Sequence, residues 1–136
     1  MAQAKYTGRC LCGGIRYEIR GDIGEIIQCH CQYCRKANGA AFATNAPVRV
    51  KDFRFLQGEG LLKKYQSSDV AQRCFCENCG SPIMSIKSTA PEFYRLRLGT
   101  LDSPLPHKPS KHIFVADKAN WDVIYDGLPQ YDQWAD

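Results

Sequence analysis

The stretch Cys76-Glu77-Asn78-Cys79-Gly80 carries two thiols that are separated by two residues and followed by a glycine. This spacing lets the backbone curl so that both sulfurs reach one metal ion, and Gly80 can take the positive φ that such a knuckle often needs. A tighter pair stands near the amino end, in Cys10-Leu11-Cys12-Gly13. Because four thiolates complete a closed tetrahedral site, we expect Cys10, Cys12, Cys76 and Cys79 to hold one structural zinc ion.

A third cluster is the stretch Cys29-His30-Cys31-Gln32-Tyr33-Cys34. Its three thiols are too close in sequence to stay apart in a compact loop, so we expect one metal ion to bind all three. Zinc held by three protein ligands keeps a fourth position for substrate or water. The triplet therefore predicts a catalytic zinc and raises the expected total to two per chain. A closed site, with Cys74 or a histidine as the fourth ligand, is the alternative.

The remaining cysteine and the histidines carry weaker signals. Cys74 lies two residues before Cys76, and in a strand it would face the same side, so we expect a small buried hydrophobe rather than a ligand. His30 stands between two ligands and should point away from their metal. A role in packing or in supporting the ligands is expected over a proton shuttle. His107 and His112 flank a proline-rich stretch, and we expect His112 to be exposed.

Length and composition indicate an ordinary globular protein. The chain has 136 residues, of which 44% are hydrophobic and 24% charged, so we expect one zinc-binding domain over 1–136. No apolar run is long enough to cross a bilayer, and residues 1–6 do not resemble a signal peptide. A cytoplasmic location follows as the default, and it favours metal ligation over a disulfide framework. Bound thiolates would offset much of the formal charge of +4, which gives no case for nucleic-acid binding.

Alternating hydrophobicity and turn residues predict a mainly β fold of antiparallel hairpins. Between Phe93 and Leu98 the alternation places the leucines on one face and Arg95 and Arg97 on the other. One helical turn is expected at 35–37, ended by Gly39. Strands are predicted over 14–20, 53–56, 61–66, 71–75, 83–86, 93–98 and 113–115.

The cysteine motifs and their flanks resemble the glutathione-dependent formaldehyde-activating enzyme family. The resemblance runs from about Gly8 to Pro129 and rests on the segments 8–13, 29–35 and 75–82, on Trp121 and on 126–129. It implies an Mss4-like fold of antiparallel β-sheets. It also implies the division of ligands given above, with Cys29, Cys31 and Cys34 on the catalytic zinc. The named activity is the condensation of formaldehyde with glutathione to S-hydroxymethylglutathione, formally a carbon–sulfur lyase reaction in reverse.

Glutathione as a partner would bring two carboxylates, for which Arg35, Lys36, Arg95 and Arg97 are candidates. Arg35 is best placed because it follows Cys34, although a solvated surface charge is the simpler expectation for any one of them. Two other readings stay open, a zinc-stabilised binding module and a thiolate-based redox or metal sensor. The sequence leaves a homodimer, the thiol and the aldehyde undecided.

Overall fold

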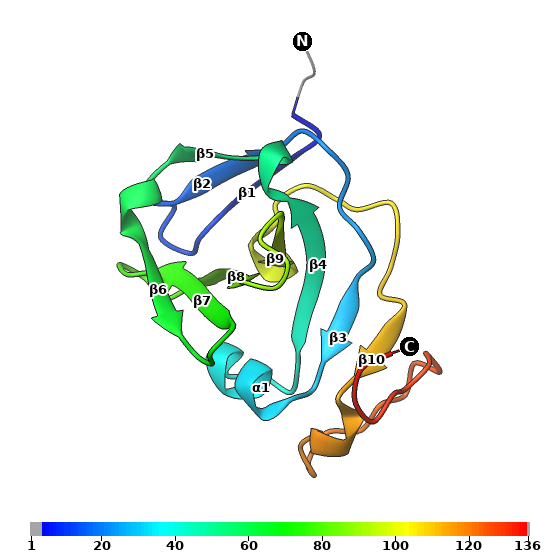
Figure 1. The fold of residues 1–136 in the computed structure, drawn as a ribbon. Helices are drawn as coiled ribbons and strands as arrows, with labels where there is room; N and C mark the ends of the chain where they lie inside the picture. The colour runs from blue at the N-terminus through cyan, green and yellow to red at the C-terminus, as the bar shows by residue number, and fades with distance from the viewer. Residues whose placement is uncertain (1–3, 136) are drawn as a thin grey trace.

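The computed structural model describes residues 4–135, which form mostly β structure (Figure 1). The strands are β1 (Tyr6–Arg9), β2 (Arg16–Ile19), β3 (Ile27–Cys29), β4 (Ala43–Arg49), β5 (Phe53–Gln57), β6 (Leu62–Gln66), β7 (Ala71–Cys76), β8 (Pro82–Lys87), β9 (Phe93–Arg97) and β10 (Lys111–Ile113). Helix α1 covers Gln32–Asn38, and short 3-10 turns cover Val50–Asp52, Glu59–Leu61, Leu98–Thr100 and Val115–Asp117.

The strands form two sheets. The smaller sheet has the order β1-β2-β5, and the larger has the order β10-β3-β4-β9-β8-β7-β6. Every neighbouring pair is antiparallel except β10 with β3, which is parallel. In Figure 1 the smaller sheet lies at the end of the molecule opposite α1, while β10 and the C-terminal segment lie beside β3. The fold is thus mainly β, as expected, with one parallel pair that hairpins alone would not give.

The main core lies where the two sheets meet. The alternation that predicted a strand near 14–20 buries Ile15, Tyr17 and Ile19 completely. The Tyr17 ring stacks on Phe53 of β5 at a centroid distance of 4.9 Å. Fully buried aliphatic side chains from the larger sheet, Val48, Ile83 and Leu96, belong to the same cluster. This packing fixes the smaller sheet on the larger one.

Most of the predicted strands are present, and the helix is longer than expected. The structure contains strands within or overlapping all seven predicted ranges, although β10 lies two residues earlier than predicted. Helix α1 ends before Gly39, which takes the left-handed conformation that the prediction required. Three strands were missed, β1, β3 and β4.

The segment after β10 contains one 3-10 turn, Val115–Asp117, and then folds back along β10. Backbone bonds link the His112 N–H to the Pro129 carbonyl (2.9 Å) and the Phe114 N–H to the Gln133 carbonyl (3.0 Å). Ala135 packs against the small apolar cluster that contains Cys29 and Cys34. Within residues 4–135, no helix is long and apolar enough to cross a membrane.

Candidate metal centres and the adjoining cavity

The two outer cysteine pairs meet between the β1–β2 and β7–β8 turns. The sulfurs of Cys10, Cys12, Cys76 and Cys79 all lie within 4.8 Å of one another. Cys10 and Cys12 are 3.5 Å apart, and Cys12 and Cys76 are 3.9 Å apart. A tetrahedron with zinc–sulfur bonds of about 2.3 Å has sulfur–sulfur edges of about 3.8 Å, so this donor set fits a zinc ion.

Local backbone geometry builds this four-cysteine cluster. Gly13 and Gly80 both have positive φ, +75° and +80°, as the knuckle pattern requires. Backbone N–H groups donate to the sulfurs, from Ile15 to Cys10 at 3.3 Å and from Gly14 to Cys12 at 3.4 Å. Such donors stabilise thiolates, the form that binds metal.

Side-chain donors act in the same direction. The Asn78 amide, 3.3 Å from the Cys12 sulfur, is the main cause of the lowered pKa of Cys12. The Ser81 hydroxyl, 3.2 Å from the Cys79 sulfur, lowers the pKa of Cys79 to about 5. Cys12 and Cys79 are therefore prepared to bind as thiolates, whereas burial raises the pKa of Cys76 to about 11.

The middle cysteines form a second, three-sulfur cluster at the start of α1. Cys29 ends β3, Cys31 is the N-cap of α1, and Cys34 lies in its first turn. The Cys31 sulfur accepts the Cys34 backbone N–H at 3.3 Å, in the position where a serine or aspartate oxygen usually caps a helix. The three sulfurs lie within 4.8 Å of one another, and no fourth His, Cys, Asp or Glu of residues 4–135 joins them.

Charge is unevenly shared within the triplet. Hydrogen bonds from the Cys29 and Cys31 thiols lower the pKa of Cys34, and the positive charges of Arg97 and Arg73 lower it further. The Arg73 Nη1 lies 3.8 Å from the Cys34 sulfur. The triplet is thus an anionic centre with cations at its side.

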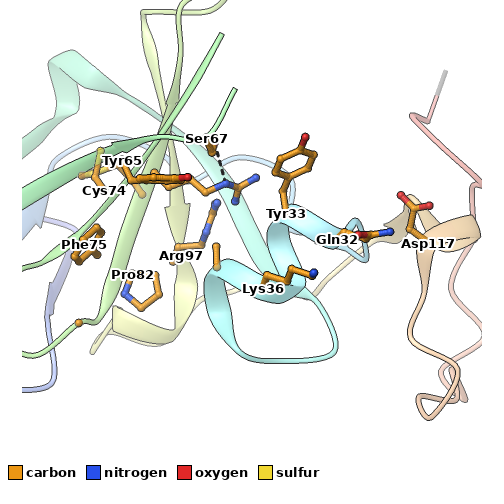
Figure 2. A pocket seen from close by; sticks show the side chains of 14 residues that line it. Gln32, Tyr33, Lys36, Tyr65, Ser67, Cys74, Phe75, Pro82, Arg97 and Asp117 are labelled. Carbon is orange, nitrogen blue, oxygen red and sulfur yellow. Dashed lines mark hydrogen bonds between the residues drawn. The ribbon is translucent and has the colours of Figure 1, made fainter. Parts of the chain in front are cut away.

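A cavity of about 890 Å³ opens between α1 and strands β6 to β9 (Figure 2). Arg73 and Arg97 belong to its wall, which brings the cavity next to the triplet although no triplet sulfur lines it. Figure 2 shows Arg97 pointing from the sheet into this space, with Tyr33 and Lys36 of α1 on the other side. The full lining is Gln32, Tyr33, Lys36, Ala37, Tyr65, Ser67, Arg73, Cys74, Phe75, Gly80, Pro82, Met84, Arg97 and Asp117.

The predicted cationic residues divide into several environments. Arg97 is only 6% exposed, so the expectation of a solvated charge is wrong for it. Lys36 lines the cavity, as Arg97 does. Arg95 lies outside the lining and stacks over Trp134 at 5.6 Å. Arg35 is half-buried and does not line the cavity, and its Nε is buried without a hydrogen-bond partner among the described residues.

His30 points away from the triplet into a buried relay of side chains. Its Nε2 is 2.8 Å from the Nδ1 of His112, whose Nε2 is 2.8 Å from an Asp126 carboxylate oxygen. On the other side, His30 Nδ1 faces Asp122 at 3.9 Å. Burial is the main cause of the lowered pKa of His30. The relay ties the cysteine triplet's loop to residues 122–126.

The prediction of an exposed His112 is wrong. Its ring is 2% exposed because β10 places it between His30 and Asp126. A smaller cavity of about 340 Å³ adjoins it, lined also by Phe42 and Asp122. His107, the other histidine of that stretch, has its Nε2 3.0 Å from the Gly24 carbonyl oxygen.

Cys74 is buried in the main core and belongs to neither cysteine cluster. Burial raises the pKa of its thiol, as expected of a small hydrophobe. It lines the larger cavity, a position that its spacing from Cys76 did not indicate.

Sequence reasoning also missed Arg73. In the sequence, Arg73 is only a charged residue within the predicted strand 71–75. Such a residue is equally well explained by a position on the solvent-exposed face of the strand. The structure instead holds its guanidinium between the Ser67 hydroxyl, which accepts from Nε at 3.2 Å, and the Cys34 sulfur.

Together, the fold and the two clusters define a small β protein with two thiolate sites suited to metal ions, one of them beside a cationic cavity. The profile of the glutathione-dependent formaldehyde-activating enzyme family matches residues 5–117, and the chain belongs to this family.

The two sheets described above fit the Mss4-like fold of this family, as expected. Two other proteins are similar to the chain. An uncharacterized lyase of Schizosaccharomyces pombe is 30% identical over 79 residues, which cover 58% of this chain and 56% of that protein. The match thus spans little more than half of the relative's length. The crystal structure of a Rhodobacter sphaeroides protein superposes with a TM-score of 0.61 at 27% identity, covering 74% of this chain and 91% of that one.

Proposed function

We propose that this chain is a zinc-dependent carbon–sulfur lyase that forms or cleaves the adduct of a small thiol with an aldehyde. Glutathione and formaldehyde, which combine to S-hydroxymethylglutathione, are the first pair to test because the family is named for them. The observation that carries the proposal is the three-sulfur cluster beside a cavity with cationic walls. Such a site suits an anionic thiol.

In this proposal the two cysteine clusters have different tasks. Cys10, Cys12, Cys76 and Cys79 would close a structural zinc site, and the triplet would hold the catalytic zinc. A zinc ion with an open position stabilises a bound thiolate or polarises a carbonyl oxygen. Three thiolates give the zinc centre a net negative charge, which weakens the ion as a Lewis acid. We therefore favour a role in which the zinc stabilises the substrate thiolate.

The chain's own residues would orient the two reactants. The cavity wall would hold the thiol so that its sulfur lies beside the triplet and in position to attack the aldehyde carbon. The sulfur lone pair attacks the carbonyl carbon, a carbon–sulfur bond forms, and the carbonyl π electrons move to oxygen. The thiol proton leaves the sulfur and a proton reaches the oxygen, so that the hemithioacetal is neutral at that centre. The lyase direction reverses these steps.

A cytoplasmic location and a single domain over 1–136 belong to the same proposal. Seven cysteines that must stay reduced to bind metal favour a reducing compartment.

The proposal is tested by replacing one triplet sulfur. Cys31→Ser should lose one of two zinc equivalents and turnover of the glutathione–formaldehyde adduct, because Cys31 is both a ligand and the cap of α1. Arg54→Gln is the control, since Arg54 is exposed on β5 of the smaller sheet and lies outside both clusters and the larger cavity. It should keep both zinc equivalents and activity. Full activity of Cys31→Ser would refute the catalytic role of the triplet.

A binding module is the second candidate, favoured by apolar side chains near the C-terminal end. Within residues 121–134, Trp121, Val123, Tyr125, Tyr131 and Trp134 are exposed large hydrophobics. The sequence had shown no clear apolar patch. A stoichiometric partner that survives Cys31→Ser and is lost on Tyr125→Ser would favour this candidate over the enzyme.

A further inference from the structure

Two arginines in the wall of the larger cavity have no carboxylate partner among residues 4–135. Arg73 comes from β7 and Arg97 from β9, and both line the cavity. Neither lies within 4.0 Å of a carboxylate oxygen among residues 4–135. Asp117 is the one acidic residue in the described lining, and it pairs with neither of them. A buried arginine normally has a paired anion, and Arg97 is buried, so this arrangement requires an explanation.

The hydrogen bonds of both guanidinium groups leave donors for a ligand. Arg97 uses Nη1 to donate to the Asn45 side-chain oxygen at 2.7 Å and to the Arg95 carbonyl at 3.2 Å. Arg73 uses Nε toward Ser67 and Nη1 toward Cys34. The Nη2 groups of both arginines make no hydrogen bond to described residues, and neither is among the buried atoms without a partner. Each Nη2 is therefore not fully buried, and because both side chains line the cavity, a carboxylate there could accept hydrogen bonds from them.

The charges around this point do not balance within the protein. Burial is the main cause of the lowered pKa of Arg97, to about 10, and the positive charge of Arg73 contributes to the lowering. Cys34 acts in the opposite direction. Once a divalent metal ion binds the three sulfurs, the triplet retains one negative charge, while the two arginines carry two positive ones. A further anion would restore neutrality.

We propose that Arg73 and Arg97 form an anion subsite that binds a carboxylate of the thiol substrate and places its sulfur beside the triplet. This inference rests on the proposed function and restricts it to thiols that carry a carboxylate. Arg97 is held rigidly by Asn45 and makes the main contact. Arg73 connects the subsite to the triplet, because its Nη1 lies 3.8 Å from the Cys34 sulfur, so it sets the separation between the carboxylate and the triplet.

The test uses a probe that keeps the carboxylates and lacks a free thiol. Binding of S-methylglutathione to the zinc-loaded protein is measured by isothermal titration calorimetry, with its diethyl ester as the counterpart that lacks both carboxylates and keeps the amino group. We expect wild type to bind the acid at least about tenfold more tightly than the ester, because the ester loses charge-assisted hydrogen bonds. Arg97→Gln and Arg73→Gln should each remove most of that preference.

A matched control removes the same charge elsewhere. Arg54 is an exposed residue of β5 in the other sheet, and Arg54→Gln should leave the preference for the acid over the ester unchanged. Thermal melting checks that each variant is folded. If buried Arg97→Gln does not fold, the partly exposed Arg73→Gln still decides the matter. Equal binding of acid and ester by wild type, or an unchanged preference in folded Arg73→Gln, would overturn the subsite.

The outcome also separates this inference from the proposed function. An arginine-dependent preference without turnover of any thiol–aldehyde adduct would leave the subsite standing and reject the lyase. Turnover that is equally fast with glutathione and its diethyl ester would reject the subsite and leave the lyase standing.

Discussion

Loss of one ligand from the four-cysteine cluster should destabilise this protein far more than loss of one ligand from the triplet. The relevant change is Cys76→Ser, compared with Cys31→Ser. A metal ion in the four-cysteine cluster ties Cys12 to Cys76, which are 64 positions apart. In the triplet the ligands lie within six consecutive residues, Cys29 to Cys34, so the metal closes only a local loop.

Chain entropy gives the size of the difference. A cross-link that closes a loop of 64 residues stabilises the folded state by about 4 kcal/mol. Cys76 is also fully buried in the core, where a serine hydroxyl would lack the metal as its partner. We therefore expect Cys76→Ser to lower the free energy of unfolding by about 4 kcal/mol or more, and the melting temperature by about 15 °C.

The assay is thermal unfolding by circular dichroism, with the zinc content of each purified variant measured in parallel. Cys31→Ser should melt within about 5 °C of wild type. If Cys31→Ser melted as low as Cys76→Ser, the assignment of a structural and a catalytic cluster would be wrong. If Cys76→Ser retained two zinc equivalents and the wild-type melting temperature, the cross-link argument itself would fail.

Three further predictions concern the packing around the site. The buried hydroxyl of Tyr17 has its pKa raised to about 12, mainly by burial, so above pH 10 the unfolded chain loses this proton before the folded one does. Stability should fall by about 2–3 kcal/mol between pH 10 and pH 12, and urea unfolding of Tyr17→Phe should lack this component. Gly8→Ala should lower the free energy of unfolding, measured in urea, by about 1–3 kcal/mol, because the added Cβ would overlap the Tyr17 ring. An unchanged urea midpoint would contradict the packing described. His112→Ala should lower the free energy of unfolding by about 3 kcal/mol, because it leaves His30 without its partner. Asp126→Asn, at the more exposed end of the relay, should lower it by less than about 1 kcal/mol. Equal losses of unfolding free energy would contradict the relay.

The sequence predicted the metal clusters because their ligands are close together along the chain. Each of the two knuckles and the triplet has its ligands within a stretch of at most six residues. The structure brings together the same sets of sulfurs that the sequence predicted. Alternation likewise predicted β2 and β9, whose apolar positions face the core. The C-terminal end of α1 was predicted from Gly39, which is its C-cap. Each of these depends on local pattern.

The missed features depend on contacts between distant segments. Strand β4 contains Pro47 and the polar pair Thr44 and Asn45, so its pattern does not indicate a strand, yet it pairs with both β3 and β9. Arg97 alternates with leucines as a surface residue would, but the cavity beside α1 encloses it. His112 was placed at the surface because nothing in its neighbourhood shows that residues 122–126 return to cover it.

The wide separation of the outer cysteine pairs has a consequence for how the protein is made. Ribosomes add about 5–20 residues per second, so Cys79 follows Cys12 by several seconds. The triplet is completed by Cys34, long before the partners of Cys10 and Cys12 exist. A nascent chain therefore presents five thiols without the second knuckle, and a zinc ion captured early can bind a mixed set of them. We expect correct pairing to depend on ligand exchange once the second knuckle has been made, so expression under zinc limitation should give misloaded chains rather than chains that simply lack metal.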